Sequence, residues 1–137
     1  MIRTNVRTHV TFTRMVAEKD QTRIEIDLAV DSPPLFPIET IDGLPVLAPQ
    51  DLAARKVLAI LDRAEGRDYT DLCALVKRFG RKACVDWALQ LDAGLTTTAI
   101  ADAFGGLDRL ADAELPSPEP DVVRGLFTAW SIELRGT

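Results

Sequence analysis

LAPQDLAARKVLAILDRAEGRDYTDLCALVKRF, residues 47–79, is the stretch that decides the fold class of this 137-residue chain. Pro49 is a favoured residue in the first turn of a helix, and Asp51 follows near the positive helix end. Apolar residues then recur at helical spacing, and the predicted buried stripe is Leu52, Ala53, Val57, Ile60, Leu61 and Ala64. The pattern predicts a helix that begins at Pro49.

A charged corner, Glu65-Gly66-Arg67-Asp68, separates this helix from a second one. We expect Gly66 to break the first helix and Asp68 to act as the N-cap of the second, with Asp71 three residues later as in a capping box. The second helix buries Leu72, Leu75, Val76 and Phe79 and ends at Gly80. Capping is by itself a sufficient reason for Asp68.

Lys56 lies at the border of the first apolar stripe, and Arg63 follows two turns later on the same line. Two interpretations of Lys56 remain open. Its ammonium group extends to water along the helix surface, as lysines commonly do. Alternatively, the ammonium is held at the edge of the core to meet an anion such as a phosphate.

The residues before the central stretch alternate as β-strands do. Residues 9–17 and 23–30 predict an antiparallel hairpin with one apolar face, and Glu25 and Asp27 share its other face. That face is either a solvated surface or a site for a hard cation such as Mg²⁺, because carboxylates two residues apart on a strand project the same way. Asp42-Gly43 predicts a second, shorter hairpin.

Three more helices are expected after the central stretch, over residues 81–92, 96–110 and from about Asp121. The predicted class is α+β: a small, mostly antiparallel sheet of two hairpins, followed by a bundle of about five helices. We expect one domain over residues 1–137, β-rich over 1–47 and helical over 48–137.

The net charge of −5 gives the chain no general attraction to nucleic acid or to anionic membranes. Residues 97–105 resemble a helix-turn-helix superficially, but the segment after them is short and acidic, which disfavours DNA binding. The sequence shows neither a signal peptide nor a membrane-spanning run, so we expect a cytoplasmic protein. Cys73 and Cys84 fit helical patterns as small core residues.

Residues 23–75 resemble the carboxy-terminal part of the AbiEii/AbiGii nucleotidyltransferase-like toxins, which are minimal nucleotidyltransferases of the DNA polymerase β-like superfamily. The resemblance rests on Ile26-Asp27-Leu28 in a strand, on a Pro-x-Asp-Leu-x-x-x-Lys helix start and on an Arg-x-x-x-Arg-Asp-x-x-Asp corner. Residues 126–134 are similar to the closing helix of shorter members. The resemblance is therefore expected over about the last four-fifths of the chain, with a partial nucleotidyltransferase-like fold.

The resemblance implies a toxin of a type IV toxin–antitoxin (abortive infection) system, with a cognate antitoxin. Such proteins use Mg²⁺ to transfer a nucleotidyl group from a nucleoside triphosphate (NTP) to an acceptor, in several cases the 3′ end of tRNA. Asp27 matches the third metal-binding carboxylate and has Glu25 beside it as a second metal candidate. Lys56 matches the lysine that meets the triphosphate, so Asp27 and Lys56 are the expected catalytic residues. The expected nucleotide-binding residues are Lys56, Arg63, Arg67, Asp68 and Asp71.

One family feature does not precede Asp27: a Gly-Gly or Gly-Ser turn followed by Asp-x-Asp. Since a lone third carboxylate cannot assemble a two-metal site, we expect no transfer unless the missing half is supplied. A truncated or decayed toxin, a misassigned start and half of a split enzyme all remain open. The alternative is a non-catalytic interaction domain that binds an antitoxin or forms a homodimer through an exposed side of the sheet.

Overall fold

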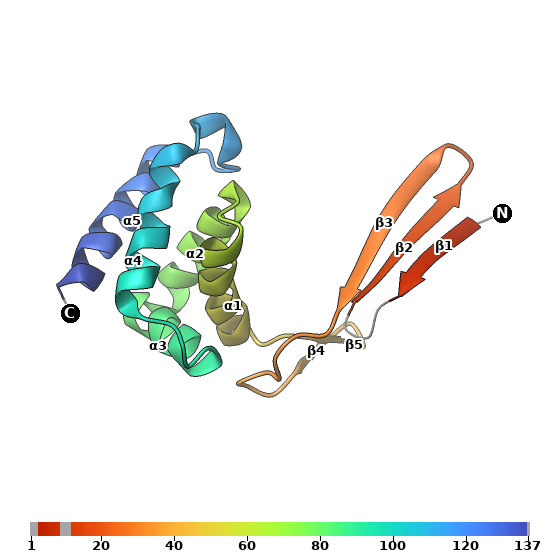
Figure 1. Ribbon diagram of the computed structural model, residues 1–137, viewed down its shortest axis with the longest axis horizontal. Helices are drawn as coiled ribbons and strands as arrows, with labels where there is room; N and C mark the ends of the chain where they lie inside the picture. Colours follow the sequence, from red (N-terminus) through yellow and green to blue (C-terminus); the bar gives the residue numbers. More distant parts are fainter. Residues whose placement is uncertain (1–2, 9–11, 137) are drawn as a thin grey trace. The chain divides into compact units, whose positions relative to one another are not determined.

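The computed structural model describes residues 3–8 and 12–136, and the chain forms two compact units, Met1–Pro33 and Pro34–Thr137 (Figure 1). The first unit holds a three-stranded antiparallel sheet in which β2 (Phe12–Lys19) lies between β1 (Arg3–Thr8) and β3 (Thr22–Ala29). The second unit contains the hairpin of β4 (Glu39–Ile41) and β5 (Leu44–Val46), followed by the helices.

The sheet of the first unit confirms the predicted hairpin and adds a strand, β1, that the sequence did not predict. The beginning of the predicted first strand, residues 9–11, lies outside the described residues. The register pairs Met15 with Ile26 and Arg14 with Asp27. Directly paired residues share a face of the sheet, so β3 keeps its apolar side chains on one face and its carboxylates on the other.

Five α-helices follow in the described part of the chain, as predicted, and the fold is α+β. Their bounds are α1 (Pro49–Asp62), α2 (Gly66–Phe79), α3 (Arg81–Leu91), α4 (Thr97–Gly105) and α5 (Pro120–Arg135). The predicted fourth helix is shorter than expected, because it passes at Gly106 into a 3₁₀ turn, η1 (Gly106–Arg109), which is followed by η2 (Asp112–Glu114). No helix in the described part of the chain is long and apolar enough to cross a bilayer.

The core of the second unit is built from all five helices. Its centre is aromatic: the ring of Phe127 on α5 lies 5.0 Å from the rings of both Tyr69 and Phe104, in edge-to-face geometry. Trp130, one helical turn after Phe127 on α5, packs against the ring of Phe104. The predicted stripe of α1 is buried at Ala53, Val57 and Ile60, but the prediction was wrong for Leu52, which is 40% exposed.

The corner between α1 and α2 differs from its prediction. Asp68 is not an N-cap: α2 begins at Gly66, Glu65 holds the cap position, and Asp68 lies within the first turn, fully buried. The chain turns at Ala64, whose φ of 49° is in the left-handed region. Gly66 is required for a different reason, since a Cβ there would lie 1.9 Å from the carbonyl oxygen of Glu114. The corner is therefore shaped by contact with η2.

Candidate functional site

Asp68 is the centre of a charged cluster between α1 and α2. Arg63 donates to it twice, from Nε to Oδ2 at 2.8 Å and from Nη2 to Oδ1 at 2.7 Å. Lys56 Nζ lies 3.1 Å from Oδ1 of Asp68 and 2.8 Å from Oδ2 of Asp71. The structure thus brings together four of the predicted site residues, which we call the Asp68 cluster: Lys56, Arg63, Asp68 and Asp71.

Helical spacing explains why these four residues meet. Lys56 and Arg63 are seven residues apart on α1, which places them on one face two turns apart, although Arg63 stands just past the last helical residue. Asp68 and Asp71 are three residues apart on α2 and also share a face. The short corner folds one face onto the other, because α1 and α2 are neighbours in the bundle.

Contacts within the cluster hold Lys56, Arg63 and Asp68 in their charged forms at neutral pH. Hydrogen bonds from Arg63, and then from Lys56, lower the pKa of Asp68 to about 2, although burial opposes this shift. Burial lowers the pKa of Lys56, but its hydrogen bonds to Asp71 and Asp68 outweigh that effect, so the net shift is upward. Lys56, Arg63 and Asp68 are therefore a fixed set of charges, and none of these three groups is poised to exchange a proton near pH 7.

One cation of the cluster, Arg63, also faces outward. Arg63 binds Asp68 through Nε and Nη2, which directs Nη1 away from that carboxylate, and its side chain is 42% exposed. Lys56 and Arg63 line a hollow of about 220 Å³ along α1. The other residues of this α1 hollow are Leu52, Arg55, Ala59 and Asp62. Its size and its cations suit a phosphate group.

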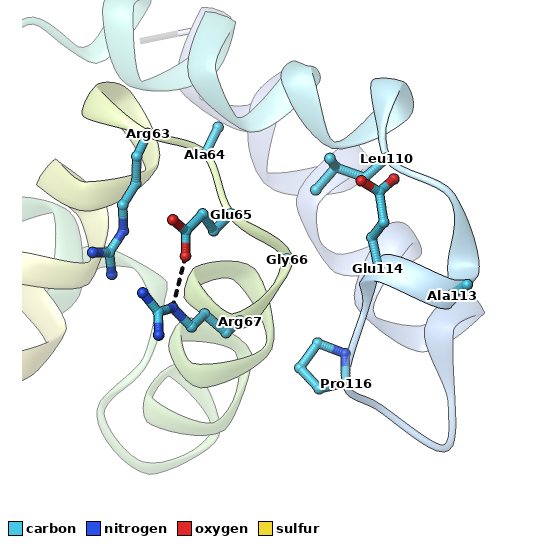
Figure 2. Close-up of a pocket in the computed structure, with 9 residues that line it drawn as sticks. All are labelled: Arg63, Ala64, Glu65, Gly66, Arg67, Leu110, Ala113, Glu114 and Pro116. Carbon is cyan, nitrogen blue, oxygen red and sulfur yellow. Dashed lines mark ion pairs between the residues drawn. The ribbon is translucent and has the colours of Figure 1, made fainter. Parts of the chain in front are cut away.

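A second hollow, of about 600 Å³, lies at the corner, and Arg63 lines both hollows. In Figure 2 the side chains of Arg63, Glu65 and Arg67 lie on one side of it, and those of Leu110, Glu114 and Pro116 on the other. Arg67 Nε pairs with Glu65 Oε2 at 2.8 Å, so this predicted site residue lies at the rim of the corner hollow instead of joining the Asp68 cluster.

The predicted metal residues lie on β3, in the first unit. Asp27 accepts from Arg14 with both oxygens, Nε to Oδ1 at 2.7 Å and Nη2 to Oδ2 at 2.9 Å, and this hydrogen bonding lowers its pKa. Glu25 Oε1 lies 3.6 Å from Arg23 Nη2. No group of three or more potential ligands occurs among the residues that the structure describes. Since Mg²⁺ requires near-octahedral oxygen coordination, these residues alone do not fit the ion.

Sequence reasoning missed the roles of two residues that the structure makes important. Asp51 is fully buried and accepts from the backbone N–H groups of Leu35 and Phe36, each at 2.9 Å, so it fixes the segment before β4 onto α1. The second is Arg14. The signal for it was present, because a charged residue interrupts the alternating apolar positions of β2 opposite a carboxylate on β3.

Residues 3–115 match the protein family described as "Nucleotidyl transferase AbiEii toxin, Type IV TA system". The chain belongs to the AbiEii family. The matched range contains every predicted site residue, from Glu25 to Asp71. The expected extent was wrong, however: the similarity begins at residue 3 and ends before α5, so it lies in the amino-terminal part of this chain and leaves out the closing helix. No curated protein and no solved structure gives a significant match.

Proposed function

We propose that the chain acts in a type IV toxin–antitoxin system as a nucleotidyltransferase-like toxin, and that its helical unit binds the triphosphate of an NTP. One observation carries the proposal: a single buried carboxylate, Asp68, holds both Lys56 and Arg63 beside the α1 hollow. Cations fixed in this way lose little conformational freedom when they bind an anion.

The roles within the Asp68 cluster follow from which atoms remain directed outward. Arg63 offers Nη1, and Lys56 offers the ammonium hydrogen not directed at Asp68 or Asp71. Positioned cations stabilise the charge that spreads over phosphoryl oxygens during transfer. Asp68 and Asp71 act as positioning residues, and Arg67 provides a further cation at the rim of the corner hollow.

The acceptor in this proposal is RNA, with the 3′ end of tRNA as the first substrate to test. Asp27, with Glu25 beside it, would contribute to Mg²⁺ binding only together with carboxylates from a further polypeptide segment. Support comes from the family, whose members are nucleotidyl transferases, and from the position of both carboxylates on one face of β3.

Transfer is tested by incubating the chain with α-labelled NTPs, Mg²⁺ and tRNA. The reaction is run with and without the amino-terminal half of a family member that carries Gly-Ser and Asp-x-Asp. We expect labelled tRNA only when that half is present, and loss of label with Arg63→Gln. Lys82→Gln is the matched control, because Lys82 is an exposed cation on α3. Absence of label in every combination would contradict the proposal.

An alternative is an interaction domain without catalysis. It is favoured by the apolar face of β3, where Ile24 and Leu28 are more than half exposed. Surfaces of this kind are found at protein–protein contacts. Here the partner would be the cognate antitoxin or a second copy of the chain. Light scattering and a pull-down with the antitoxin test this: a dimer or a retained antitoxin supports it, and a monomer that retains none contradicts it.

A further inference from the structure

The corner hollow has one charged wall and one mostly apolar wall. Arg63, Glu65 and Arg67 stand on the first, and Leu110 and Pro116 stand on the second (Figure 2). At about 600 Å³ the hollow has the size of sites that bind small molecules, which combine apolar surface with a few polar groups that orient the ligand. A nucleoside needs both: an apolar surface for its flat base, and polar groups for the edge of the base and the ribose.

Both walls of the corner hollow are held in place. On the charged wall, Glu65 Oε2 fixes Arg67 Nε at 2.8 Å. The apolar wall belongs to the segment of η1 and η2, which Arg124 ties to α5 by donating to the carbonyl oxygens of Leu107 at 3.1 Å and Leu110 at 2.6 Å. A hollow with fixed walls loses little conformational freedom when a ligand enters.

The charges of the two hollows suit different parts of one nucleotide. Three basic residues and one acidic residue line the α1 hollow, whereas two arginines and two glutamates line the corner hollow. The first therefore suits a triphosphate, and the second suits an uncharged nucleoside. Arg63 lines both, so the two hollows adjoin at this side chain.

We propose that the corner hollow binds the nucleoside of the NTP whose triphosphate lies in the α1 hollow. The base packs against Leu110 and Pro116, and its polar edge faces Arg67 and Glu65, whose charged groups lie on the opposite wall. Arg63 stands where the nucleoside meets the phosphates. The inference rests on the function proposed above for the Asp68 cluster and adds to it a location for the nucleoside.

The test is calorimetric titration of the full chain with a non-hydrolysable NTP and with tripolyphosphate, which has no nucleoside. Ala113→Leu enlarges an exposed side chain that lines the corner hollow. We expect it to weaken NTP binding about fivefold, because it fills space that the base occupies, and to leave the affinity for tripolyphosphate unchanged. Ala74→Leu is the matched control, since Ala74 is an exposed alanine of α2 away from the lining of both hollows.

Arg67→Lys provides a second variant, which keeps the charge but loses the planar, forked donor group. We expect the affinity for the NTP to fall about two- to fivefold, as loss of one hydrogen bond to the base implies, and the affinity for tripolyphosphate to stay the same. Arg78→Lys is its control, because Arg78 lies on the same helix outside the lining of the corner hollow.

Backbone NMR signals of the unaltered chain locate the nucleoside without any substitution. We expect the NTP, but not tripolyphosphate, to shift the amide signals of Gly66, Ala113 and Glu114. NTP-induced shifts confined to α1, or an NTP affinity that Ala113→Leu and Arg67→Lys both leave unchanged, would overturn the inference. Tripolyphosphate binding that weakens in Arg63→Gln would still support the Asp68 cluster, so a failure of this inference and a failure of the proposed function are distinguishable.

Discussion

The carboxylate of Asp68 accepts two hydrogen bonds from Arg63, at 2.8 and 2.7 Å, while its own side chain has no exposure to solvent. Lys56 completes the arrangement from the preceding helix. Three of the predicted site residues, Lys56, Arg63 and Asp68, are thus first of all partners of one another. Any anion that they bind meets cations whose positions are already set by the fold.

Asp68→Asn should lower the free energy of unfolding by about 3 kcal/mol, because it leaves the charges of Arg63 and Lys56 without their buried partner. Denaturant unfolding measures the effect. Asp71→Asn is the matched control: its carboxylate is half exposed, so we expect a loss below about 1 kcal/mol. Equal losses for the two variants would contradict the central position of Asp68.

Stability should fall in acid through the titration of Asp68. Its folded pKa of about 2 lies below the ordinary value of 3.8, so its contribution is complete above about pH 4 and is lost as the pH falls toward 2. We expect this contribution to be about 1–2 kcal/mol, reduced by the exposure of Arg63. Between pH 7 and pH 2, the free energy of unfolding should therefore decrease less steeply for Asp68→Asn than for the unaltered chain. An unchanged slope would argue against the lowered pKa.

Gly66→Ala should destabilise the protein by about 3 kcal/mol, since the new Cβ would collide with the backbone of Glu114. Gly125→Ala provides the comparison: it adds the same atom within α5, where nothing lies within 4 Å. Helix propensity predicts a gain of up to about 1 kcal/mol there. Thermal unfolding of both variants measures the contrast. A Gly66→Ala variant as stable as the unaltered chain would contradict the close contact between the corner and η2.

Ala64→Gly should stabilise the protein by about 0.5 kcal/mol, because Ala64 has a φ of 49° and a glycine adopts this conformation without steric cost. Ala74→Gly, at an exposed position within α2, should instead cost about 1 kcal/mol. Opposite signs in denaturant unfolding are the expected result. A loss at both positions would mean that the left-handed turn carries no strain.

Local pattern was sufficient for most of the fold. The helical repeats predicted five helices, and Asp42-Gly43 predicted the turn between β4 and β5, because both signals lie within a few residues. The strand β1 was not predictable in this way, since Arg3–Thr8 contains a single large apolar residue, Val6. It is recognisable as a strand only through its pairing with β2.

The candidate site was predictable in part. Spacing placed Lys56 and Arg63 on one face of a helix, and that prediction rests on helix geometry alone. The role of Asp68 was not predictable, because its buried carboxylate binds Arg63 and Lys56, and a capping pattern does not indicate such contacts. A capping pattern indicates where a helix can begin, but α2 begins at Gly66, before Asp68, and Glu65 holds the cap position.

The most direct test of the account is calorimetric titration of the full chain with a non-hydrolysable NTP. We expect saturable binding that weakens about tenfold or more in Arg63→Gln, as loss of a charge-assisted hydrogen bond to phosphate implies. Arg67→Gln, outside the Asp68 cluster, should weaken binding less, and Lys82→Gln should leave it unchanged. No binding by the unaltered chain, or equal affinities of the unaltered chain and a folded Arg63→Gln variant, would contradict the claim that the Asp68 cluster holds a triphosphate.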